Sequence, residues 1–268
     1  MQNKHMNLVS VVVVVYNSSE TVVETLDTIL KQTYRNIELI VTDDCSTDDT
    51  VKIVKSWMIE NHKRFARCGI VKNKKNLGVT KNCNIGITKV KGKYIQLIAG
   101  DDLLYPEAIR KKVEYAEMEQ CPYVFSKMKA FGNNIKSVND VNKIFEKNYK
   151  IMRSDWKTQD EQIEIRNFVI SPMFYTKKFF NEMCGYDERF PMLEDYPFVF
   201  KIIKSGYRIN LLEEELAGYR VTDNSLSHAG SSAYIKSCKK FFYKVRIWEL
   251  IKKRKFKEMY EQIQEFCI

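Results

Sequence analysis

Residues 8–32 read LVSVVVVVYNSSETVVETLDTILKQ, and this stretch decides the fold of the chain. Its first part, Leu8–Tyr16, is a run of β-branched residues typical of a strand that is buried on both faces. Asn17–Ser19 supplies helix-capping side chains, and Thr21–Gln32 has the apolar spacing of a helix. The stretch therefore predicts a strand, a turn and a helix.

The same order repeats along the first hundred residues, which predicts an α/β fold. A mostly parallel sheet flanked by helices is the expected result, because parallel strands need helical crossovers. The expected segments are the strand Ile37–Thr42, the helix Thr50–Asn61, an edge-like strand Ala66–Val71, a loop and helix over Leu77–Thr88, and the strand Tyr94–Ala99.

The pattern is less clear after residue 110. Residues Phe131–Gln162 are polar and show no regular period, so we interpret them as an insertion or mobile flap. The other expected elements are the helix Glu107–Gln120, the strands Tyr123–Ala130, Phe168–Tyr175 and Tyr207–Leu212, the helices Lys177–Met183 and Glu194–Ser205, and a wholly helical segment from Ser231.

Composition indicates a folded protein with anionic partners. The chain has 268 residues, 44% of them hydrophobic, and a net charge of +10. This charge suits nucleic acid, phosphorylated small molecules or an acidic membrane surface. The seven cysteines are scattered and lack metal-site spacing, which favours reduced thiols in the cytosol. The apolar run Leu8–Val15 is too short to cross a bilayer.

Acid pairs follow two of the predicted strands. Asp43–Asp44 and Asp101–Asp102 lie where parallel strands present their carboxyl ends, which is where open α/β sheets bind ligands. Adjacent carboxylates suit Mg²⁺ or Mn²⁺ together with a substrate phosphate. The alternative is that Asp101–Asp102 only favours the dipole of the next helix. For Asp43–Asp44, the alternatives are a helix start or contacts with a ribose or base.

Two further motifs carry possible chemistry. The small-residue loop Asn76–Gly86 contains Lys81, which could meet a phosphate, although a surface loop is the simpler interpretation. The acid pair Glu194–Asp195 could cap the helix that follows it. It could also supply a general base beside the anomeric carbon of a sugar.

Taken together in this order, the motifs resemble the GT-A glycosyltransferases of family 2, over roughly residues 8–226. The matching pieces are Val11–Asn17, Asp43-Asp44-Cys-Ser-Thr-Asp, Asn76-x-Gly78 with Lys81, Gly100-Asp101-Asp102 with Pro106, Gly185-Tyr-Asp-Glu-x-Phe, Glu194-Asp195-Tyr, and Tyr219-Arg220 followed by Asn224-Ser-x-Ser227. The resemblance implies a GT-A (Rossmann-like) catalytic domain over 1–230, with 131–165 as an acceptor-side insertion or flap. Residues 231–268 form a helical extension.

The resemblance also implies site roles. Nucleotide binding falls to Tyr16, Asn17, Asp43, Asp44, Asn76, Gly78, Lys81 and Asp101, with Tyr16 against the base and Asp43 and Asp44 on uracil and ribose. Asp102 and Asp101 hold Mn²⁺ or Mg²⁺. Asp195 is the catalytic base, with Glu194 beside it.

Some positions depart from the family pattern. Ala99 replaces a frequent aspartate, Thr222 stands where many relatives have histidine, and His228 is a substitute for that histidine or a surface residue. The Gln-x-x-Arg-Trp signature of processive relatives is absent, which predicts one sugar per encounter.

The implied activity is that of a metal-dependent, inverting hexosyltransferase. It would move one sugar from a UDP-sugar to a saccharide acceptor, in the manner of bacterial capsule and O-antigen enzymes. We expect a polyprenyl-pyrophosphate-linked acceptor, no nucleic acid partner, and a cytoplasmic location, peripheral on the inner face of the plasma membrane.

Residues 231–268 hold ten basic and four acidic side chains, and their apolar residues have helical spacing. Two interpretations stay open: helices packed on the catalytic domain with solvated basic faces, or a basic amphipathic surface on an anionic membrane. Two other functions are weaker alternatives. A sugar-nucleotide nucleotidyltransferase would need a Gly-rich basic loop after the first strand, and a nucleic-acid-binding protein would show a recognised motif.

Overall fold

The computed structural model describes residues 6–168, 173–222 and 232–267, apart from the side chains of 265–267. The described strands are β1 (Val9–Val15), β2 (Ile37–Asp43), β3 (Arg67–Lys72), β4 (Tyr94–Ala99), β5 (Leu103–Leu104), β6 (Tyr123–Phe131), β7 (Phe174–Thr176) and β8 (Leu211–Arg220). The described helices are α1 (Val22–Leu30), α2 (Thr50–Asn61), α3 (Val79–Thr88), α4 (Ala108–Met118), α5 (Ile135–Met152), α6 (Trp156–Ile163), α7 (Lys177–Glu182), α8 (Asp195–Lys204), α9 (Ser232–Phe241), α10 (Ile247–Lys252) and α11 (Phe256–Cys267), with short helical turns η1 (His62–Arg64) and η2 (Phe242–Arg246).

The strands form one sheet with the order β3-β2-β1-β4-β7-β6-β8-β5. Its first half is parallel, because β1 pairs with β2 and β4, and β2 pairs with β3, all in parallel. Its second half is mixed: β7 is antiparallel to β4 and β6, β8 is parallel to β6, and β5 is antiparallel to β8. The predicted α/β class is confirmed, and the parallel arrangement is confined mainly to the first four strands.

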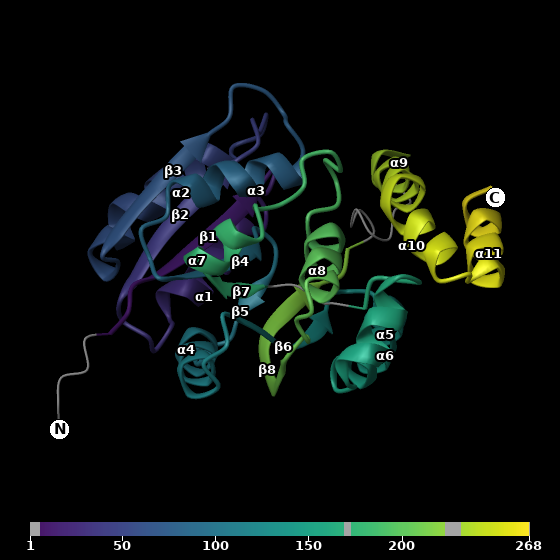
Figure 1. The fold of residues 1–268 in the computed structure, drawn as a ribbon. Helices are drawn as coiled ribbons and strands as arrows, with labels where there is room; N and C mark the ends of the chain where they lie inside the picture. The colour runs from purple at the N-terminus through teal and green to yellow at the C-terminus, as the bar shows by residue number, and fades with distance from the viewer. Residues whose placement is uncertain (1–5, 169–172, 223–231, 268) are drawn as a thin grey trace.

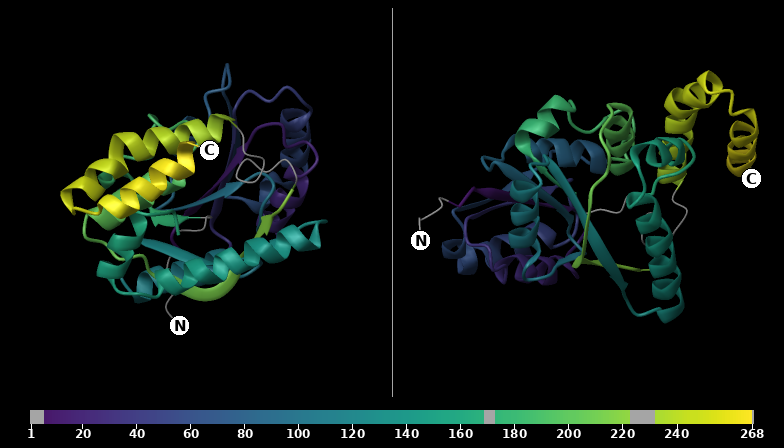
Figure 2. Two further views of the ribbon diagram at one scale, coloured as in Figure 1. Left: turned by 90° about the vertical axis from the view of Figure 1, so that its right-hand side faces the viewer. Right: turned by 60° about the horizontal axis from the view of Figure 1, so that its bottom comes forward.

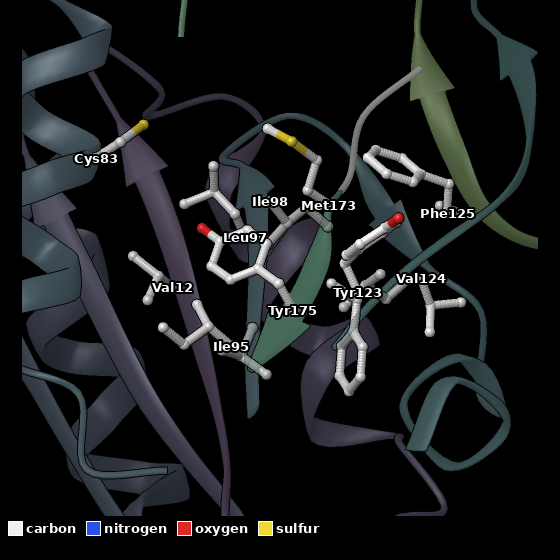
Figure 3. Close-up of a cluster of buried hydrophobic side chains, with 14 of the residues drawn as sticks. Val12, Cys83, Ile95, Leu97, Ile98, Tyr123, Val124, Phe125, Met173 and Tyr175 are labelled. Atoms are coloured by element: carbon white, nitrogen blue, oxygen red, sulfur yellow. The ribbon is translucent and has the colours of Figure 1, made fainter. Parts of the chain in front are cut away.

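The valine run forms the centre of the sheet, as its sequence predicts. Val9, Val11, Val12 and Val13 have no exposed surface. Figure 3 shows Val12 in a buried cluster with Ile95 of β4, Tyr175 of β7 and Cys83 of α3. Apolar contacts on both faces therefore fix β1 in place, and its carboxyl end lies between those of β2 and β4.

The short strand β5 shows that the sheet curls. It follows β4 after only three residues, Gly100–Asp102, yet it pairs with β8 at the far end of the strand order. Because so short a link spans at most about 14 Å, β8 must come back to the end of β4. The segment with the predicted metal-binding acids is this link.

Two segments of the second half differ from what their sequence patterns indicate. Residues 131–162, which show no regular period in the sequence, contain α5 and all but the last residue of α6, and their interpretation as an insertion or flap stays a prediction. Helix α5 does have an apolar period, hidden among its many polar residues, because Val141, Phe145, Tyr149 and Met152 are buried along one side. The last strand, predicted at Tyr207–Leu212, runs instead from Leu211 to Arg220.

The C-terminal helices pack on the rest of the protein. Figure 1 shows α9, α10 and α11 beside α8, α5 and α6, and Figure 2 shows the same grouping from two other sides. The Phe241 ring of α9 lies 5.0 Å from that of Tyr196 and 5.1 Å from that of Phe190. Helical structure from residue 232 onward agrees with the prediction, and part of its basic charge faces inward. Among the described residues, no helix is long and apolar enough to cross a bilayer.

Replacing Lys112 with methionine is expected to stabilise the protein. Lys112 in α4 is completely buried, its Nζ donates to Oε1 of Gln96 at 2.9 Å, and burial lowers its pKa to about 7. A methionine of similar length removes the cost of burying a charge, and we expect a gain of about 1–3 kcal/mol at neutral pH.

This gain depends on pH in a defined direction. The pKa of Lys112 is lower in the folded than in the unfolded chain, so wild-type stability rises as pH increases from 7 towards 10. The difference in Tm between Lys112→Met and wild type should therefore shrink over this range. Lys74→Met, at an exposed lysine, is the control. A Tm of Lys112→Met below that of wild type at both pH 7 and pH 10 would mean that the hydrogen bond of Lys112 stabilises the protein more than the burial of its charge destabilises it.

Candidate active site

Side-chain hydrogen bonds join the loops after β1 and β2. Asn17 has a left-handed backbone, with φ of 50°. Its Oδ1 accepts from the backbone N–H of Thr47 at 2.8 Å, and its own N–H donates to Oγ of Ser46 at 2.8 Å. Asn17 thus shapes this edge of the sheet. Tyr16 remains 49% exposed, which leaves its ring accessible to a ligand.

Asp43 and Asp44 are buried and bonded within the protein. Asp43 accepts from the N–H of Ser46 at 3.1 Å. Asp44 accepts from three donors at 2.8–2.9 Å, the backbone N–H groups of Leu77 and Gly78 and the side-chain amide of Asn73. A carboxylate accepts roughly four hydrogen bonds, so Asp44 has little capacity left for a ligand. Contact of these acids with uracil and ribose stays a prediction.

Gly78 brings the loop before α3 against the segment that leads to Glu194. Its φ is 86°, and a Cβ at this position would lie 2.8 Å from the carbonyl oxygen of Pro191, so only glycine fits. Thr80 adds two hydrogen bonds to the same segment, from its N–H to the oxygen of Pro191 and from Oγ1 to that of Phe190. The start of α3 therefore fixes where Glu194 and Asp195 lie.

Arg220 holds the Asp101–Asp102 segment from β8. Its backbone N–H donates to Oδ1 of Asp102 at 3.0 Å, and its Nε donates to the carbonyl oxygen of Asp101 at 2.8 Å. The guanidinium also pairs with Glu24 and lies 4.6 Å from the centroid of the Phe131 ring. Burial raises the pKa of Asp101 and, together with the charge of Asp101, raises that of Asp102 well above the usual range.

The two acids fit a divalent cation that a substrate helps to bind. Among the described residues, no group of three or more His, Cys, Asp or Glu side chains could hold a metal. Mg²⁺ and Mn²⁺ nevertheless bind through one or two carboxylates plus substrate phosphates. A cation would offset the cost of ionising these neighbouring buried carboxyl groups. Asp101 and Asp102 therefore suit a metal that arrives with its phosphate ligand.

Glu194 and Asp195 lie at the start of α8. Both are partly accessible to solvent and partly buried by neighbouring residues. Oδ2 of Asp195 accepts from Nδ2 of Asn167 at 3.0 Å, and Oδ1 accepts from the N–H of Tyr196 at 2.6 Å. Burial raises the pKa of both acids. For Glu194, burial and the charge of Asp195 together raise the pKa to about 8. The two donors favour the charged form of Asp195, so the first proton to leave the pair leaves Asp195.

Cys83 in α3 shows that several of these acids lie close together. Burial raises its pKa, and the charges of Glu194, Asp44 and Asp195 raise it further. Asp44 directly follows β2, at the carboxyl end of that strand. Because Glu194 and Asp195 lie near the same cysteine as Asp44, they also lie near this edge of the sheet. The structure thus brings acids from the β2 end and the start of α8 around one helix.

Two predicted nucleotide contacts face outward. Lys81 forms an ion pair with Glu188 at 3.4 Å, and both side chains are nearly half exposed. Asn76 is exposed, and its Oδ1 accepts from the N–H of Gly78 at 3.1 Å. Lys81 and Asn76 therefore lie at the solvent-exposed rim of the site, and either side chain would have to reach a nucleotide from there.

A cleft of about 380 Å³ separates this rim from α9. Its lining combines loop backbone and helix side chains from three places in the sequence: Asn76, Leu77, Gly78, Pro191, Met192, Ala233, Lys236, Ser237 and Lys240. Lys236 and Lys240 are one helical turn apart, so both amino groups can serve the same ligand. The cleft lies next to the segment that carries Glu194.

Three contributors to the site were not predicted from the sequence. Arg220 was part of a quoted motif but was given no role, Asn167 lies outside the recognised motifs, and α9 was assigned to the extension. Tyr234 of α9 lies close enough for Asp195 to raise its pKa, after the larger effects of burial and Cys238. Thr222 is exposed, and His228, Asn224 and Ser227 lie outside the described residues.

Comparisons with known sequences agree with the motifs. The family model described as Glycosyl transferase family 2 matches residues 10–180. An uncharacterized glycosyltransferase of Haemophilus influenzae is 31% identical over 247 residues, which are 87% of this chain and 71% of that protein. The match of the model includes Asp44 and Asp102 but ends before Asp195.

A more narrowly named relative matches over a shorter range. The UDP-Glc:alpha-D-GlcNAc-diphosphoundecaprenol beta-1,3-glucosyltransferase of Escherichia coli is 35% identical over 123 residues, 45% of this chain. The aligned part spans 46% of that protein, less than half of its length.

Solved structures share the fold. S. aureus TarS, in complex with UDP-GlcNAc, superposes with a TM-score of 0.67 and 19% identity over 90% of this chain and 66% of that one. The mannosyltransferase PcManGT from Pyrobaculum calidifontis, in complex with GDP-Man and Mn²⁺, superposes with a TM-score of 0.66 and 18% identity. The superposition covers 93% of this chain and 65% of that one. At this identity the likeness shows the fold alone, which is the predicted GT-A fold with its C-terminal helices.

Proposed function

Because the chain belongs to glycosyltransferase family 2, we propose that it is an inverting enzyme of bacterial surface polysaccharide synthesis. It would move one sugar from a UDP-sugar to a hydroxyl group of a saccharide acceptor. The observation that carries this proposal is Asp195, a partly accessible carboxylate whose two oxygens are both held by N–H donors beside the strand-end acids.

The donor would bind at the carboxyl ends of β1, β2 and β4. The exposed Tyr16 ring offers a stacking surface for a base, and the loops that carry Asn17 and Asp44 are rigidly bonded to each other. The UDP-Glc in the name of the Escherichia coli relative supports UDP as the nucleotide.

Asp101 and Asp102 would hold the divalent ion, and Arg220 keeps this segment in place. The Mn²⁺ in the complex of PcManGT supports a metal of this kind. A bound Mn²⁺ or Mg²⁺ would neutralise the donor diphosphate and stabilise the leaving UDP.

Asp195 would act as the general base. Its charged form accepts the proton of the acceptor hydroxyl while that oxygen attacks the anomeric carbon from the side opposite UDP. One displacement inverts the anomeric configuration. Glu194, with a pKa of about 8, would be largely protonated at neutral pH and so would not repel the charge of Asp195.

Calorimetry and a UDP-release assay over a panel of UDP-sugars, each with and without Mn²⁺, test the function. We expect metal-dependent UDP binding and slow hydrolysis of one donor, which identifies the sugar. If UDP fails to bind with either Mn²⁺ or Mg²⁺ present, the proposed donor class is wrong.

The acceptor would be a saccharide linked to a polyprenyl pyrophosphate. Two features support this proposal: the name of the Escherichia coli relative, which includes a diphosphoundecaprenol-linked substrate, and the cleft beside Glu194, which Lys236 and Lys240 line. Their ammonium groups suit a diphosphate.

Such an acceptor would place the enzyme on the inner face of the plasma membrane. The C-terminal helices expose large apolar side chains between their lysines, as a membrane surface requires. This C-terminal apolar set consists of Ile235, Tyr243, Trp248, Ile251, Phe256 and Tyr260.

Replacing both Trp248 and Tyr260 with serine is expected to cause a several-fold loss of binding to vesicles that contain anionic phosphatidylglycerol. Both side chains are more than half exposed, so the folded structure should be unaffected. Co-sedimentation of the full chain measures the effect, because deleting the tail would uncover the buried Phe241. Ile59→Ser, in α2, is the control. Equal binding of the double variant and wild type would contradict a membrane role for this surface.

A further inference from the structure

The residues that follow α6, 164–168, support the carboxylate of Asp195. Asn167 lies in this segment, and its Nδ2 donates to Oδ2 of Asp195 at 3.0 Å. Asp195 begins α8, where the side chain has no preceding helical turn to restrict it. The amide of Asn167 therefore determines which way one of its oxygens points.

Arg246 holds the same segment from the C-terminal helices. It is 6% exposed, and its Nε donates to the carbonyl oxygen of Glu164 at 2.7 Å. Its Nη2 donates both to the carbonyl oxygen of Ile165 and to Oε1 of Gln262 in α11. A planar guanidinium with several fixed donors suits such a junction of three chain segments.

Arg246 also contacts the helix that carries the base. Its guanidinium carbon lies 5.3 Å from the centroid of the Tyr196 ring, and Tyr196 directly follows Asp195. The hydroxyl group of Tyr196 donates to the carbonyl oxygen of Ile163, at the end of α6, at 2.7 Å. Arg246 thus contacts α8 directly and also holds the segment that bonds to its first residue.

A buried ion cluster makes this connection strong. Glu164 has no exposed surface, and three lysines surround its carboxylate: Lys204 of α8, and Lys253 and Lys255 at 2.7 and 3.3 Å. Lys204 and Lys253 also contact Asp160 of α6 at 2.6 and 2.5 Å. Because the charges are paired on several sides, separating the C-terminal helices from α6 would leave buried charges unpaired.

We propose that Asn167 and Arg246 are positioning residues, through which the C-terminal helices hold the carboxylate of Asp195 in its reactive orientation. The inference rests on the proposed role of Asp195 as the base. It makes the helical extension a structural part of the active site.

Asn167→Ala tests the last step of this connection. We expect kcat to fall about 10-fold to 100-fold, because a small misplacement of a reacting group costs that much. The acidic limb of the pH–rate profile should move to higher pH, because the lost donor favoured the charged form. Affinity for UDP should not change. The other titratable groups near Asp195 are Glu194, Cys83, Tyr196, Tyr234 and Cys238, and Asn167→Ala leaves them in place.

Arg246→Met tests the first step, with Arg246→Lys as the conservative variant. Both should shift the acidic limb in the same direction as Asn167→Ala, and Arg246→Lys should do so less, because lysine keeps the charge without the fork of donors. Arg166→Met is the matched control, since Arg166 is an exposed arginine between Ile165 and Asn167. Thermal unfolding and UDP binding identify any variant that has not folded.

The results separate this inference from the proposed function. An inactive Asp195→Asn together with an unchanged rate and pH profile for Asn167→Ala would overturn the positioning role alone. Near-normal transfer by Asp195→Asn would overturn the base and this inference with it. If Arg166→Met matched Arg246→Met, the effect would belong to the segment rather than to Arg246.

Discussion

Asp195→Asn is expected to lower kcat by about 10²–10⁴-fold, the usual contribution of a general base. Asparagine has nearly the same shape: its Oδ1 can still accept from the N–H of Tyr196, and its Nδ2 can donate to the side-chain oxygen of Asn167 once that amide turns over. It cannot take a proton from the acceptor hydroxyl. Calorimetry should therefore find UDP binding unchanged, while transfer to the acceptor almost stops.

Glu194→Gln provides the contrast. The pKa of Glu194 is about 8, so glutamine resembles its protonated state at neutral pH, and most of the activity should remain at pH 7. In the wild type, the rate should rise with pH as Asp195 loses its proton, over a range above that of an ordinary aspartate, because burial raises its pKa. A large loss in Glu194→Gln with little change in Asp195→Asn would assign the base to Glu194 instead.

Asp102→Asn should abolish the effect of Mn²⁺ on UDP binding and lower kcat by about 10²-fold or more, since the leaving diphosphate loses its stabilisation. The asparagine Oδ1 can still accept from the N–H of Arg220, so the link between β4 and β8 is kept. Calorimetric titration of UDP with and without Mn²⁺ measures the change. Asp49→Asn, at an exposed acid, is the control.

The same variant should be more stable than wild type when no metal is present. The pKa of Asp102 is raised in the folded protein, so ionising this carboxyl at neutral pH opposes folding, and asparagine removes that cost. A higher Tm without metal and a smaller rise on adding Mn²⁺ and UDP are expected. If Asp102→Asn keeps the full metal effect on UDP binding, Asp102 is not a ligand.

The first half of the fold follows directly from sequence, because its central strands β1, β2 and β4 are mostly apolar runs between clear turn signals. Helix α2 and strand β4 agree with their predicted bounds to the residue. The second half depends on packing between distant segments. The strand β8 has three consecutive glutamates, Glu213–Glu215, between apolar residues, and its pairing with β6 contains register shifts, so no simple period marks it.

The candidate site also contains residues that local sequence predicts and residues whose contacts depend on packing between distant segments. The sequence predicts that Asp44 and Asp102 lie at one edge of the sheet, because acids that directly follow buried parallel strands collect there. Asn167 could not be found, because its role depends on how α6, α8 and the C-terminal helices meet. Arg220 lies between these cases: its motif was recognised, but its contact with Asp102 spans 118 residues of sequence.

The pairing of β5 with β8 has a consequence for the order of folding. The link that carries Asp101 and Asp102 receives its hydrogen bonds from Arg220, so a chain still emerging from the ribosome cannot complete this part of the site until residue 220 has been made. Contacts of such long range form late, because the intervening loop must first be ordered. The nascent protein should therefore complete the geometry of this link, and of the metal site proposed there, late in synthesis.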